Sequence, residues 1–156
     1  MSSFSHIDEE GRARMVDISR KPRMARTAVA EGFLHIQPET AEQIRSRRLP
    51  KGDPFEVARI AGIQAAKRTS SLIPLCHDLH LDFADVEIEL LERSWKIRST
   101  VSCRRGTGVE MEALTAVTVA ALTLYDMCKA VDKDMRIGEI RLIEKRKEPL
   151  KDEAGS

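Results

Sequence analysis

The segment SLIPLCHDLH, residues 71–80, places a thiol beside an imidazole and a second imidazole three residues later. Cys76, His77 and His80 are potential zinc ligands, but a tetrahedral site would need one of two distant cysteines to close it. Adjacent side chains point apart along an extended chain, so His77 is poorly placed to activate Cys76 as a nucleophile. We therefore expect no metal site, and we expect His77 to face a ligand.

A second group of candidate residues lies in the apolar segment LTLYDMCKAV. Asp126 and Lys129 stand three residues apart there, and charged residues are rarely fully buried without a partner. One interpretation is an internal ion pair without function. The other is a buried carboxylate and amine that alter each other's protonation and act as general base and general acid. We favour the catalytic interpretation.

Further charged residues lie near the expected ends of helices. Lys51 in LPKGDPF directly precedes a helix start, where backbone amides and a flexible ammonium can hold phosphate, although an ordinary loop lysine is the alternative. Lys67 and Arg68 fall in the last turn of the same helix, where the helix dipole favours cations without any function. Glu110 and Glu112 fall in the first turn of a later helix, and for Glu110 the dipole is a sufficient explanation.

The elements that must position these residues follow from hydrophobic periodicity. In chain order we expect a strand at residues 26–36, a helix at 38–47, a helix at 54–68, an antiparallel hairpin of strands at 81–91 and 95–103, a long helix at 109–132 and a strand at 137–147. This order predicts an α+β fold: a four-stranded antiparallel sheet with helices packed on one face, in a ferredoxin-like arrangement.

Some details of these elements can be predicted more closely. The helix at 54–68 begins with Asp53 as N-cap, and its apolar stripe consists of Val57, Ile60, Ala61 and Ile63. The segment at 109–132 lacks glycine and proline and is apolar nearly all round, which predicts a buried central helix. In the hairpin, acids on one strand should oppose bases on the other.

Composition limits the class of protein. The 156 residues are 42% hydrophobic, which suits one domain over residues 1–156, with a flexible arm of few contacts at about 1–20, a short strand in it at MVDI, and a frayed tail at about 147–156. The 26 basic and 25 acidic residues give no strong field for nucleic acid or membranes. Three scattered cysteines and the lack of a signal peptide or membrane-spanning run suit a cytoplasmic protein.

An alternative of another class is a non-catalytic module that binds RNA or an acidic protein through the basic segments RSRRLPK and EKRK. Aromatic residues make up only 4% of the chain, which is few for base stacking. A charged pair inside an apolar helix would also add nothing to phosphate binding. We therefore prefer an enzyme.

The segments HIDEEGRARMVDIS, KGDPFEVARIAGIQAAKRTSSLIPLCH and TGVEMEALTAVTVAALTLYDMCKAVDKDM closely resemble the molybdenum cofactor biosynthesis protein C family, the cyclic pyranopterin monophosphate synthases. The resemblance extends over residues 6–145. It implies a lyase of molybdopterin biosynthesis that takes the 3′,8-cyclised dihydro-GTP made by a radical SAM enzyme and yields cyclic pyranopterin monophosphate and pyrophosphate. It implies no cofactor, no nucleic-acid or membrane partner, and a homohexamer built as a trimer of dimers with sites at the dimer interface.

The resemblance also implies roles for individual residues. The catalytic residues would be the acid/base pair Asp126 and Lys129 together with Lys51, Lys67 and His77, and the substrate-binding residues would be Leu75, Cys76, His77, Met111 and Glu112. Two positions depart from the family pattern: Asp78 stands where proline is usual, and Gly106 stands where a basic residue is common. Either departure alters the charge or stiffness of a loop near the expected phosphates.

Overall fold

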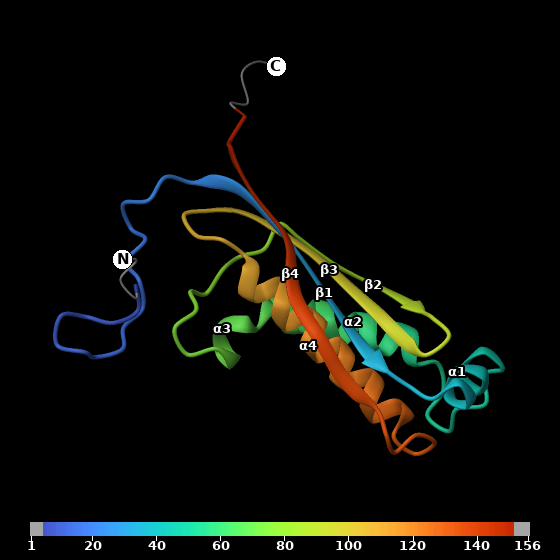
Figure 1. Cartoon of the computed structure of the whole chain (residues 1–156). Helices are drawn as coiled ribbons and strands as arrows, with labels where there is room; N and C mark the ends of the chain where they lie inside the picture. Colours follow the sequence, from blue (N-terminus) through green and yellow to red (C-terminus); the bar gives the residue numbers. More distant parts are fainter. Residues whose placement is uncertain (1–4, 152–156) are drawn as a thin grey trace.

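The computed structural model describes residues 5–151 of the chain (Figure 1). Its elements, in chain order, are β1 (Met24–His35), α1 (Pro38–Arg45), α2 (Pro54–Lys67), α3 (Thr69–Leu72), β2 (Phe83–Leu90), β3 (Ser94–Arg105), α4 (Glu110–Cys128) and β4 (Arg136–Pro149). The expected order is confirmed, and the single turn α3 is an addition. The strand β4 runs two residues further than expected, into the predicted tail.

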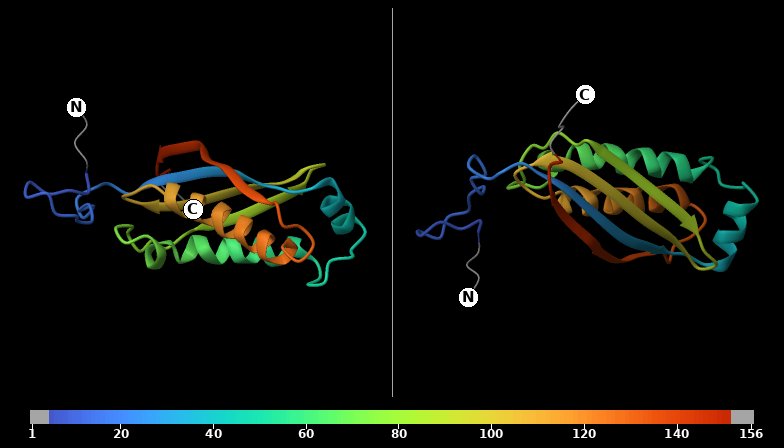
Figure 2. Two further views of the ribbon diagram at one scale, coloured as in Figure 1. Left: turned by 60° about the horizontal axis from the view of Figure 1, so that its bottom comes forward. Right: turned by 90° about the horizontal axis from the view of Figure 1, so that it is seen from above.

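The four strands form one antiparallel sheet in the order β2-β3-β1-β4. Helices α2 and α4 cover one face of this sheet, while α1 lies beyond one of its ends (Figure 2). This is the ferredoxin-like arrangement that the sequence predicted. The hairpin register is also confirmed, because Glu87 stands opposite Arg98 and Glu89 stands opposite Lys96.

Helix α2 begins as predicted, since the Asp53 carboxylate accepts a hydrogen bond from the Phe55 amide at 2.9 Å. Its predicted apolar stripe is wrong at two positions, because Val57 is 50% exposed and Ile60 is 51% exposed, whereas Ile63 packs against the core. The buried face consists of small residues instead: Ala58, Gly62, Ala65 and Ala66. Small side chains let α2 approach α4 closely, so size rather than hydrophobicity selects the buried face.

Gly62 marks the closest approach of the two helices. A Cβ atom at this position would lie 2.9 Å from the Ala116 carbonyl oxygen and 3.2 Å from the Ala120 Cβ. The backbones of α2 and α4 are therefore too near each other for any side chain at position 62. This contact fixes the relative position of the two helix ends that carry candidate residues.

Helix α4 is continuous from Glu110 to Cys128, and one side of it is buried against the sheet and α2. By length and composition it could cross a membrane, but it is the core helix of this fold. It is not buried all round, however. An outward stripe along α4 consists of Met111, Thr118, Leu122, Asp126 and Lys129, which recur at helical spacing and are exposed.

The arm before β1 differs from its prediction. Residues 15–18 are not in a strand, and a single bridge joins Ile7 and Ala13 instead. Most described residues of the arm are exposed, but the arm does reach the loop that carries His77 and packs on the β3–α4 turn at Gly106. Polar composition failed to reveal these contacts because two of them are made by the arm's backbone carbonyls rather than by its side chains.

Candidate functional site

The candidate residues gather in two groups near opposite ends of α4. At the C-terminal end, the Asp126 carboxylate lies 3.0 Å from the Lys51 Nζ and 2.9 Å from the Lys129 Nζ. Lys51 also donates to the Asp126 backbone carbonyl at 3.3 Å. The structure thus joins Lys51, from the loop before α2, to the predicted Asp126 and Lys129 pair. We call these three residues the acid–lysine cluster.

The prediction that Asp126 and Lys129 are buried is wrong within the single chain. Their side chains are 55% and 56% exposed, because both lie on the outward stripe of α4. The flanking ammonium groups of Lys129 and Lys51 lower the pKa of Asp126 by hydrogen bonding and charge attraction. Asp126 is therefore a firmly ionised carboxylate that accepts from two donors.

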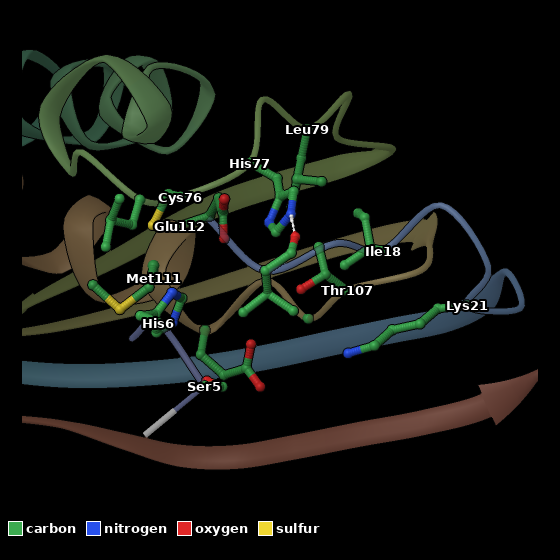
Figure 3. A pocket seen from close by; sticks show the side chains of 14 residues that line it. Ser5, His6, Ile18, Lys21, Cys76, His77, Leu79, Thr107, Met111 and Glu112 are labelled. Atoms are coloured by element: carbon green, nitrogen blue, oxygen red, sulfur yellow. Dashed lines mark hydrogen bonds between the residues drawn. The ribbon is translucent and has the colours of Figure 1, made fainter. Parts of the chain in front are cut away.

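The second group surrounds a cavity of about 260 Å³ near the N-terminal end of α4 (Figure 3). Its lining comes from the arm, the loop after α3, the β3–α4 turn and the first turn of α4. The lining residues are Ser5, His6, Val16, Ile18, Lys21, Leu75, Cys76, His77, Leu79, Thr107, Gly108, Glu110, Met111 and Glu112. All five predicted substrate-binding residues are among them, and we call this cavity the arm pocket.

Two acidic groups of the arm pocket differ in charge. Glu112 is only 4% exposed, and its burial, with Glu110 nearby, raises its pKa to about 7. Burial also raises the pKa of Glu110, but the hydrogen bond from Lys145 at 2.5 Å, a backbone hydrogen bond and the charges of Lys145 and Arg26 together outweigh it, so the net pKa is lowered. At neutral pH the pocket therefore offers one carboxyl that can hold a proton and one that cannot.

His77 and Cys76 lie side by side in sequence but differ in environment. The His77 Nε2 lies 2.6 Å from the Val16 carbonyl oxygen of the arm. Burial and the nearby Glu112 raise the pKa of the Cys76 thiol. Cys76 is consequently a poor nucleophile, which agrees with a contact role rather than covalent chemistry.

Lys67 belongs to neither group by direct contact. It is exposed at the end of α2 and does not line the arm pocket. The arm residues of the pocket, in contrast, were absent from the predicted site. The signal that pointed to them was the family-like segment HIDEEGRARMVDIS, which spans most of the arm.

Within residues 5–151, no three His, Cys, Asp or Glu side chains are grouped to hold a metal ion. The two basic segments that favoured a binding module each use cations in ion pairs. Lys51 binds Asp126, Lys145 binds Glu110, and Arg146 lies 2.6 Å from Glu144. These pairs reduce the positive charge that either segment offers to a polyanion.

The fold and these two groups define a ferredoxin-like α+β protein with a candidate acid–base site. The model of the MoaC family matches residues 15–148. The chain belongs to the MoaC family.

Individual relatives agree with this assignment. The chain is 56% identical over 147 residues to the cyclic pyranopterin monophosphate synthase of Chloroflexus aurantiacus, covering 93% of this chain and 90% of that protein. It is 52% identical over 147 residues to the protein of the same name from Roseiflexus castenholzii, covering 93% of each. It is 57% identical over 139 residues to a molybdenum cofactor biosynthesis bifunctional protein of Chlorobaculum tepidum, covering 89% of this chain but only 45% of that longer protein.

Proposed function

We propose that this chain is a cyclic pyranopterin monophosphate synthase, a lyase of molybdenum cofactor biosynthesis. The substrate is (8S)-3′,8-cyclo-7,8-dihydroguanosine 5′-triphosphate, and the products are cyclic pyranopterin monophosphate and pyrophosphate. The observation that carries the proposal is the placement of Asp126 between Lys51 and Lys129 in a chain that belongs to the MoaC family. This arrangement joins a proton acceptor to two proton donors without requiring an organic cofactor.

The chemistry divides between the two groups of residues. Opening and rebuilding the ring system requires proton transfers at several heteroatoms, for which the acid–lysine cluster supplies a carboxylate and two ammonium groups. Glu112, with its pKa near 7, can give or take a proton at neutral pH. Closing the cyclic phosphate requires positive charge on the departing pyrophosphate, and lysines such as Lys51 and Lys67 can supply it.

The direct test is to incubate the purified protein with the cyclised nucleotide and to measure both products. We expect pyrophosphate and cyclic pyranopterin monophosphate in equal amounts. Release of pyrophosphate without a pyranopterin, or no reaction with an authentic substrate, would refute the proposal. A steep loss of nucleic-acid retention with rising salt would instead support the binding module.

The separation of the two groups bears on how they act together. Glu112 and Asp126 are fourteen residues apart on the continuous helix α4, which corresponds to roughly 21 Å at 1.5 Å per residue. One substrate molecule can hardly contact both residues of the same chain. If both residues serve one substrate molecule, Glu112 must come from one chain and Asp126 from a second chain.

The outward stripe of α4 supports such a pairing. Between the two groups it carries Leu122, which is 58% exposed. Val119 is equidistant in sequence from Glu112 and Asp126, so a two-fold axis passing near it would set Glu112 of one chain beside Asp126 of the other. The proposed assembly is a dimer with two such composite sites, repeated three times in a homohexamer.

The proposed setting of the enzyme follows from its substrate. A nucleotide made by a radical SAM enzyme is handed over in the cytoplasm. Free thiols persist in reduced form there, which suits the three cysteines of the chain, Cys76, Cys103 and Cys128. No nucleic acid and no membrane are part of the proposed reaction.

A further inference from the structure

The arm crosses the arm pocket as residues 16–21, which we call the strap. One end of the strap is fixed on the β3–α4 turn, because a Cβ atom on Gly106 would lie 3.3 Å from both the Cβ and the carbonyl oxygen of Lys21. Just beyond it, Arg23 donates to the Arg104 carbonyl at 3.1 Å. Gly106, which has no side chain, thus leaves room for the strap to lie on the turn.

The other end of the strap meets His77. The Val16 carbonyl oxygen lies 2.6 Å from His77 Nε2, and the dashed line in Figure 3 marks this contact. A carbonyl oxygen carries no proton and can only accept. The proton in this hydrogen bond must therefore reside on Nε2.

This contact decides which atom of His77 is available for chemistry. A neutral imidazole has one protonated nitrogen and one bare nitrogen, so a proton held on Nε2 leaves a lone pair on Nδ1. His77 also lines the arm pocket, beside Cys76 and Glu112.

We propose that the strap is a positioning element that fixes the His77 tautomer, so that Nδ1 is the ring atom that accepts a proton from the substrate and later returns it. This inference rests on the proposed function only for the identity of the substrate. The proton balance is simple. The substrate loses a proton to Nδ1, which makes His77 an imidazolium. Nε2 keeps its own proton and continues to donate it to the Val16 carbonyl oxygen. In a later step, Nδ1 returns its proton to the substrate.

The docking of the strap can be tested without substrate, through the rate of trypsin cleavage after Arg14, which precedes the strap, and after Arg20, which lies within it. His77→Gln retains a donor near the position of Nε2, whereas His77→Phe retains the ring shape without a donor. We expect the wild type and the Gln variant to be cleaved at similar rates. We expect the Phe variant to be cleaved roughly five-fold faster, as the loss of one net hydrogen bond implies.

The control is His80→Phe, which alters an exposed histidine three residues away and should leave the cleavage rate unchanged. Thermal melting of each variant separates loss of the strap contact from loss of the fold. Equal cleavage of the wild type and a folded His77→Phe variant would overturn the proposed docking.

The tautomer is read from the side-chain nitrogen resonances of ¹⁵N-histidine-labelled protein, with His77 assigned by its loss in the Gln variant. We expect one protonated and one bare nitrogen, with Nε2 protonated. Averaged resonances, which indicate exchange between tautomers, would overturn the assignment.

In the synthase assay, His77→Gln should be inactive despite a docked strap, and an active Gln variant would overturn the role of Nδ1. If the wild type itself lacks synthase activity, the proposed function fails, yet the cleavage and resonance results still decide the strap.

Discussion

Asp126 contacts an ammonium group on each side, and both contacts are largely exposed to solvent in the single chain. Exposed ion pairs contribute little to stability, so the arrangement is difficult to explain as a means of holding the fold together. A carboxylate kept ionised between two donors fits the proton-transfer role proposed above. The residues of the cluster can therefore be changed without a large effect on folding.

For Asp126→Asn we expect loss of synthase turnover by at least a hundred-fold with a folded oligomer, because the amide preserves shape but cannot accept a proton. Product formation and thermal melting measure the two effects. Glu92→Gln, in the exposed β2–β3 turn, is the matched control and should change stability by no more than about 0.5 kcal/mol. A near-normal rate in the Asn variant would remove Asp126 from the mechanism.

Glu112 predicts a pH dependence of stability. Its pKa is raised from 4.5 to about 7 in the folded chain, so between these values the unfolded chain loses the Glu112 proton while the folded chain keeps it. The free energy of unfolding therefore falls as pH rises through this window, by on the order of 3 kcal/mol in all. Above about pH 7 this contribution levels off, because both states are then ionised.

Glu112→Gln should remove this slope, since the amide does not titrate. Denaturant unfolding at intervals between pH 4.5 and 8 measures the free energy of unfolding of both proteins. Subtracting one free energy from the other at each pH removes the contribution of all other titrating groups. Parallel stability curves for the two proteins would mean that Glu112 ionises normally in the folded chain.

At the scale of elements, the contact between α2 and α4 aligns the loop that carries Lys51 with the end of α4 that carries Asp126. Gly62 allows this contact, because a Cβ there would lie 2.9 Å from a backbone oxygen of α4. Gly62→Ala should therefore destabilise the fold by about 1 kcal/mol or more, although alanine is the better helix former. Gln64→Ala, on the exposed side of the same helix, is the control and should be neutral or slightly stabilising. If Gly62→Ala proves equally neutral, the two helices are not in tight contact.

Most elements could be predicted because strand alternation and helix caps are local signals. Asp53 capped its helix as expected, and the hairpin placed Glu87 opposite Arg98. The exposed sides of α2 and α4 could not be predicted, because residues such as Val57 and Leu122 are apolar yet face outward in the single chain. Hydrophobic periodicity does not distinguish a helix face that is buried in the chain's own core from an apolar face that points outward from the single chain.

The candidate site was predictable in part for the same reason. Residues in recognisable segments, such as His77 and Asp126, could be named as candidates from the sequence, and their roles stay predictions. The link from Lys51 to Asp126 depends on how α2 packs on α4, and the link from His77 to Val16 is made to a backbone carbonyl. Neither leaves a trace in side-chain types or spacing.

At the scale of the whole molecule, the roughly 21 Å between Glu112 and Asp126 predicts complementation between two inactive variants. Glu112→Ala and Asp126→Ala chains, unfolded, mixed and refolded, should recover about a quarter of normal activity. Half of the random dimers would be mixed, and each mixed dimer would have one intact composite site out of two. Each variant refolded alone is the control. No recovery despite demonstrated mixed dimers would contradict the composite site.

The position of β1 has a consequence for synthesis on the ribosome. β1 lies between β3 and β4, and its pairing with β4 joins Met24 to Pro149 and His35 to Arg136. During translation, one hydrogen-bonding edge of β1 therefore stays unpaired until β4 has emerged from the ribosome. Open edges invite pairing with neighbouring chains, and pairing across such a sequence distance is slow. Nascent chains stalled before residue 136 should consequently depend on chaperones, whereas full-length chains close this edge themselves.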